Sequence, residues 1–114
     1  MLQIDPERFD ALVDDAIDLI PDELAAMVHN LVVLVEDEPP QGEPADTLGL
    51  YDGSTLGLDA AGFLPDRVFV FRRPLLEMCT TEAELVEEVR ITVIHEVAHH
   101  FGIDDDRLNE LGWE

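Results

Sequence analysis

Apolar residues recur at intervals of three and four in the first part of the chain, which is the spacing of one face of an α-helix. Asp5 precedes Pro6 and Glu7, and this order of a capping residue, a proline and an acid is typical of a helix start. We therefore predict an amphipathic helix from Pro6 to about residue 19, and a further short helical turn that begins at Pro21. The residues on the apolar face are Phe9, Leu12, Val13, Ala16, Ile17 and Ile20.

Three shorter apolar runs in the middle of the chain have the composition of strands. Residues 31–35 form a compact β-branched run bounded by Asn30 and by acids and prolines, which indicates a buried strand. Residues 67–72 contain aromatic and β-branched side chains, and Pro74 should end that strand. Residues 48–51 are expected to form a short strand that ends in a turn at 52–53, with loops at 37–47 and 54–66.

A long helix is predicted near the C-terminal end. Thr81 and Glu84 match the capping box, and Gly102 occupies a position that favours a left-handed backbone. The helix should run from there to Phe101, and because residues 89–101 are apolar nearly all round, we expect it to be buried. A last short helix is expected over 104–111. The predicted fold class is α+β, a single domain over 1–114 with a small mixed β-sheet packed on two main helices.

The charge of the chain narrows the possible partners. Its 27 acidic and 6 basic residues, all of the latter Arg, give a net charge of −21, which argues against nucleic-acid binding and against docking on anionic lipid. A hydrophobic fraction of 46% is normal for a folded domain. A signal peptide and a run of about 20 apolar residues are not found, and Cys79 is the only cysteine. We therefore expect a cytoplasmic protein without a disulfide, in which Cys79 is buried.

The strongest chemical signal lies within the long helix. His95 and His99 are four residues apart, so they project from one face about 6 Å apart along the axis. Two imidazoles at this spacing can bind one Zn²⁺, and Glu96 beside them can accept a proton from a water that the metal activates. The alternative is an ion-paired patch, which is disfavoured because such groups are costly on a buried apolar helix.

A catalytic zinc also needs a third protein ligand. Gly102 allows the chain to turn back after the helix, and Asp105 follows it by three residues. Asp104 or Asp106 could serve instead, with Asp105 then acting as a helix cap, and Glu110 is the remaining candidate. The residues by themselves leave this choice open.

With these residues the sequence resembles the long zinc motif of the metzincin-type metallopeptidases, in the variant with aspartate as the third ligand. Over most of its length the chain is similar to a family of small bacterial zincin-like metallopeptidases. The resemblance implies His95, His99 and Asp105 as zinc ligands and Glu96 as general base. It also implies that the strand at 67–72 lines the cleft and pairs with an extended substrate.

The resemblance implies a zinc-dependent hydrolase of peptide bonds. Only nine residues follow Asp105, and none of them is a methionine, so the methionine turn and lower cleft wall of larger metzincins have no counterpart here. We therefore expect an open cleft and action on short or unfolded peptides. The alternative is an inactive zincin-fold protein that binds a basic partner through its charge. The sequence does not indicate the oligomeric state.

Several other side chains are secondary candidates. His100 lies about 140° from His95 around the helix and is expected to be a packed or surface histidine. Glu88 and Thr92 share the face of His95 and could orient an imidazole, although packing is the more ordinary role for Thr92. A site role for His29 and an oxyanion role for Tyr51, Arg72 or Arg73 remain open.

Overall fold

The computed structural model describes residues 1–27, 31–52 and 66–113 of the chain. The described residues form an α+β fold of helices and one mixed sheet, which confirms the predicted fold class. The elements, in chain order, are α1 (Pro6–Ile17), α2 (Asp22–Ala25), β1 (Leu31–Glu36), β2 (Gly49–Asp52), β3 (Asp66–Phe71), α3 (Arg72–Met78), α4 (Glu82–His100) and α5 (Asp105–Leu111).

The sheet has the strand order β1-β3-β2, with β1 parallel and β2 antiparallel to β3. The strand predicted at 67–72 is β3, and it lies in the centre of the sheet with both of its edges paired. The expectation that this strand pairs with an extended substrate is wrong, because a strand with two neighbours has no backbone groups left for a third. Among the described strands, β2 is the edge strand nearest to α4, with which it is in contact.

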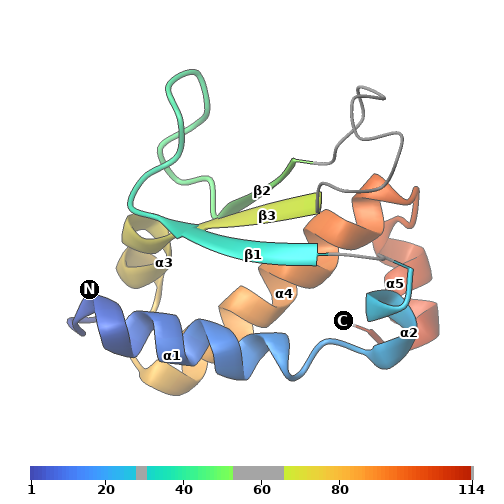
Figure 1. Ribbon diagram of the computed structural model, residues 1–114, viewed down its shortest axis with the longest axis horizontal. Coiled ribbons are helices and arrows are strands. Elements are labelled where there is room, and N and C mark those ends of the chain that lie inside the picture. Colours follow the sequence, from blue (N-terminus) through green and yellow to red (C-terminus); the bar gives the residue numbers. More distant parts are fainter. Residues whose placement is uncertain (28–30, 53–65, 114) are drawn as a thin grey trace.

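Helices α1 and α4 lie together on one side of the sheet, and the segment between β1 and β2 lies on the other (Figure 1). The predicted caps are present at both helices. The side chain of Asp5 accepts a hydrogen bond from the backbone of Arg8, and that of Thr81 accepts one from the backbone of Glu84. Arg8 also forms an ion pair with Glu82, so the first turns of the two helices are joined at the surface.

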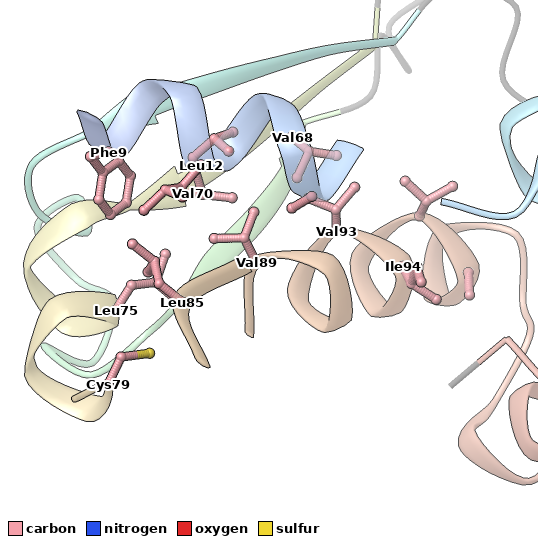
Figure 2. Close-up of a cluster of buried hydrophobic side chains, with 14 of the residues drawn as sticks. Phe9, Leu12, Val68, Val70, Leu75, Cys79, Leu85, Val89, Val93 and Ile94 are labelled. Atoms are coloured by element: carbon pink, nitrogen blue, oxygen red, sulfur yellow. The ribbon is translucent and has the colours of Figure 1, made fainter. Parts of the chain in front are cut away.

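The core fills the space between the sheet and these helices. Figure 2 shows Phe9 and Leu12 of α1, Val68 and Val70 of β3, and Val89 and Val93 of α4 converging there. Val68 and Val70 are fully buried, as expected for the inner face of a central strand. Cys79 is also buried, as predicted, and burial, with a smaller contribution from Glu88, raises the pKa of its thiol to about 11.

The structure differs from the sequence prediction in one element and in several boundaries. Helix α3 was not predicted, because Pro74 was interpreted only as the end of a strand. It lies in the first turn of α3, where its missing N–H costs no helical hydrogen bond. Helix α1 ends at Ile17 rather than near residue 19. The loop predicted at 54–66 falls outside the described residues, apart from Asp66.

Across the parts of the chain that the structure covers, no helix combines the length and the apolar character that crossing a membrane requires.

The contact between β2 and α4 is unusually close at Gly49. A Cβ atom added there would lie 2.5 Å from Cγ2 of Thr92 and 2.8 Å from the backbone oxygen of Phe69. Neither neighbour can move away easily, since Thr92 is on a buried helix face and the Phe69 oxygen belongs to the sheet. A glycine is therefore required for the strand to lie this close to the helix.

We predict that Gly49→Ala lowers the free energy of unfolding by about 1 to 3 kcal/mol, the usual cost of an overpacked core position. Thr92→Ser removes the closer of the two clashing atoms, so the double variant Gly49→Ala/Thr92→Ser should lose less than the sum of the two single changes. Urea denaturation of the four proteins measures this coupling. Strict additivity would show that β2 is not held against Thr92.

Candidate metal centre

The two motif histidines lie on one side of α4, as their spacing predicts. The ring centroids of His95 and His99 are 5.7 Å apart and the ring planes are inclined by 25°. His95 is half-buried and its Nε2 atom is shielded from solvent, whereas His99 is exposed. The pair therefore extends from the edge of the core to the surface.

The chain turns back after α4 at Gly102, which has a φ of +78°. This left-handed conformation confirms the prediction for Gly102, and the N–H of Ile103 bonds back to the carbonyl of Ala98. The turn brings Oδ1 of Asp105 to 3.2 Å from Nε2 of His99. A residue six positions beyond the second histidine is thus returned to it.

The neighbouring acids have other contacts. The carboxylate of Asp104 caps α5 by accepting a hydrogen bond from the backbone of Arg107 at 2.9 Å. Glu110 forms an ion pair with the side chain of Arg107, and Asp106 is exposed in the first turn of α5. Of the four candidate third ligands, Asp105 is the one that the structure places in contact with His99.

These donors fit zinc in type and in part in position. Bonds of about 2.0 Å to a tetrahedral ion place two ligand atoms about 3.3 Å apart, close to the separation of His99 Nε2 and Asp105 Oδ1. Imidazole nitrogens and a carboxylate oxygen are ligands that Zn²⁺ accepts. Within residues 1–27, 31–52 and 66–113, however, no three His, Cys, Asp or Glu side chains are already gathered around one point.

Glu96 lies beside the histidines on α4, and its carboxylate is held by a residue of the sheet. Its Oε1 accepts a hydrogen bond of 3.1 Å from the backbone N–H of Tyr51 in β2. Burial raises the pKa of the Glu96 carboxyl, while the Tyr51 hydrogen bond and the nearby His99 and His95 act in the opposite direction. Sequence reasoning did not find this contact, because the two residues are 45 positions apart.

Tyr51 makes two further contacts at the site. Its ring stacks on that of His100, with centroids 4.0 Å apart and planes inclined by 13°. Its hydroxyl donates a hydrogen bond to Asp66. Burial is the larger cause, and this hydrogen bond the second, of the raised pKa of the phenol. His100 is exposed and stacked on Tyr51, which agrees with the surface position that was one of its two predicted placements.

The remaining candidates are placed elsewhere or have structural roles. Arg72 and Arg73 follow the far end of β3, about 17 Å of strand away from Asp66, where they pair with Asp37 and Glu38. Neither can therefore stabilise an oxyanion beside the histidines.

The other two residues on the His95 face also differ in their surroundings. Thr92 packs against Gly49, in agreement with the simpler of its two predicted roles. Glu88 lies in the first half of α4, about two turns before His95, and near Cys79, whose pKa it raises. His29 is outside the described residues.

Comparison with known proteins identifies one matching family. The model of a zincin-like metallopeptidase family matches residues 28–113. Among solved structures, a conserved hypothetical protein from Thermo thermophilus superposes with a TM-score of 0.57. The two chains are 22% identical over 84% of this chain and 92% of that one, so the likeness concerns the fold alone. No curated protein matches this chain.

The different roles of the adjacent acids can be separated without metal. We predict that Asp104→Ala lowers the free energy of unfolding of the metal-free protein by about 1 kcal/mol, because α5 loses its cap. Asp105→Ala and Asp106→Ala should lower it by less, because each carboxylate lies in the first turn of α5 and interacts favourably with the helix dipole but does not cap the helix. Urea denaturation in the presence of a chelator is the measurement, and Asp106→Ala controls for the removal of one negative charge. A loss at position 105 as large as that at 104 would contradict the assignment.

Proposed function

The chain belongs to the zincin-like metallopeptidase family, and from this membership we propose that it is a zinc-dependent peptidase. The observation that carries the proposal is the contact between His99 and Asp105. It brings a carboxylate from beyond the helix to the same end of α4 as the two histidines. A zinc-binding sequence pattern and the fold that would complete it are thus present together.

We assign the metal to His95, His99 and Asp105. The imidazoles bind through ring nitrogens and Asp105 through a carboxylate oxygen. When bound, zinc polarises the scissile carbonyl and lowers the pKa of a water molecule. The chain itself would hold the ion with these three side chains, and a fourth side chain would accept and return the proton.

Glu96 is assigned the proton transfer. It adjoins His95 in sequence, and its carboxylate is restrained by the N–H of Tyr51 through Oε1. Oε2 is therefore the oxygen available to accept a proton from the attacking water and to return it to the leaving amine. A base held in one orientation spends less of its time in positions where transfer cannot occur.

The substrate is proposed to bind as an extended chain at the edge strand β2, not at β3. Strand β2 touches α4 beside Glu96, so a backbone added along its outer edge would pass close to the motif. Pairing of this kind requires the extended conformation of a short or unfolded peptide. The charge of −21 should favour substrates that carry Arg or Lys, and this preference should weaken as salt screens the field.

We predict that the protein binds one zinc per chain and that the ligands can be ranked by substitution. His95→Ala and His99→Ala should lose the ion on dialysis against a mild chelator, and Asp105→Ala should bind it more weakly. Asp104→Ala and Asp106→Ala are the matched controls and should retain it. Metal analysis of untagged protein tests this, and equal losses for all three aspartates would mean that the acids act only as a diffuse field.

We predict that Glu96→Gln keeps the zinc but lowers peptide turnover by roughly 10² to 10⁴, the range expected for loss of a general base. Glu88→Gln makes the same chemical change two turns earlier on α4, near Cys79, and should leave turnover unchanged. A peptide-library assay with the zinc-loaded proteins is the measurement. If the unmodified protein cleaved no more than Glu96→Gln and instead captured a specific basic partner, the family fold would here serve acidic protein binding.

A further inference from the structure

The hydrogen-bond pattern of β2 shows where its free backbone groups point. The N–H of Phe71 donates to the carbonyl of Leu48 at 2.9 Å, so these two residues form a hydrogen-bonded pair. In an antiparallel ladder such pairs alternate, and the register then makes Leu50 and Phe69 the next one. The N–H groups of Gly49 and Tyr51 are therefore directed away from β3.

Glu96 occupies one of these two outward donors. Its Oε1 lies 3.1 Å from the nitrogen of Tyr51, and the bond is charge-assisted because the acceptor is a carboxylate. The approach is possible because β2 lies directly on α4. A Cβ at Gly49 would meet Thr92 at 2.5 Å and would still lie 3.9 Å from Cγ of Glu96. Gly49 thus allows β2 to lie close enough to α4 for the N–H of Tyr51 to reach the carboxylate of Glu96.

The side chain of Tyr51 fixes β2 through two contacts, one with the central strand and one with α4. Its hydroxyl bonds to Asp66, the first residue of the central strand, and its ring lies flat on His100 of α4. His100 follows His99 directly, so the stack reaches the residue beside a proposed ligand. The position of the Tyr51 N–H is therefore tied to the sheet and to the end of the motif helix together.

We propose that Tyr51 is a positioning residue of the site: its backbone N–H holds the carboxylate of Glu96, while its ring and hydroxyl fix the strand that carries this donor. The inference rests on the proposed function only in taking Glu96 as the proton acceptor. The contact itself belongs to the metal-free chain and can be tested there. The side chain of Tyr51 is not assigned any contact with the substrate, and because its N–H is taken by Glu96, a peptide paired along β2 would bond to the other outward backbone groups of the strand.

Amide hydrogen exchange of the metal-free protein, followed by NMR, measures the contact directly. The exchange rate of the residue 51 amide is expressed relative to that of Leu50, whose N–H bonds to β3, so general destabilisation cancels. Glu96→Ala should raise this ratio about tenfold or more, the factor for losing a hydrogen bond to a charged group. Glu88→Ala, on the same helix but away from β2, should leave it unchanged.

Substitution of Tyr51 separates the ring from the hydroxyl. Tyr51→Phe keeps the stack on His100 and should stay within about threefold of the unmodified ratio. Tyr51→Ala keeps the N–H but loses both restraints, so the ratio should rise about tenfold. If Glu96→Ala or Tyr51→Ala left the ratio unchanged, the proposal would be overturned, whatever the protein does to peptides.

Kinetics of the zinc-loaded protein distinguish positioning from substrate binding. Tyr51→Ala should lower kcat about tenfold or more with little change in KM, and Tyr51→Phe should restore most of it. A raised KM with unchanged kcat would contradict a positioning role. If the unmodified protein and all variants were inactive while the exchange ratios changed as expected, the peptidase assignment would fail and the holding of Glu96 by Tyr51 would stand.

Discussion

The close contact between β2 and α4 is the constraint on which the candidate site depends. The strand can lie this close only with a glycine at position 49, because both the side chain of Thr92 and the backbone of β3 lie near the place that a Cβ would take. This contact places the edge strand over the motif helix at the level of Glu96. Without it, the N–H of Tyr51 could not reach the carboxylate, and the stack on His100 would be lost as well.

The placement of the histidines follows from how α4 is buried. The helix directs Val89, Val93 and Val97 into the core, while its last two residues, His99 and His100, lie at the surface. A metal ligand at this end can be reached from solvent and by residues that follow the helix. The left-handed turn at Gly102 brings Asp105 back to His99 at this exposed end of the helix. The buried face of α4 keeps the helix rigid, and its exposed end leaves the candidate ligands accessible from solvent.

Local sequence signals predicted the parts of the fold that local physics controls. The caps at Asp5 and Thr81 and the turn at Gly102 are set by a few neighbouring residues, and all three are found. The spacing of the histidines on α4 was predictable for the same reason.

The strand order was not predictable in this way, because the apolar run at 66–71 is consistent with a central or an edge strand. Helix α3 was missed since a proline can end a strand and begin a helix. The contact of Glu96 with Tyr51 depends on the placement of β2, which no local pattern encodes. The role of Gly49 likewise becomes visible only when α4 is laid beneath the strand.

A crystal structure of the zinc-loaded protein, with anomalous scattering recorded at the zinc edge, tests the central claim most directly. The account predicts one strong peak at about 2.0 to 2.2 Å from a nitrogen of His95, a nitrogen of His99 and a carboxylate oxygen of Asp105. Glu96 should remain outside the coordination sphere and on the N–H of Tyr51. A peak among the surface acids, or one ligated by Glu96 in place of Asp105, would contradict it.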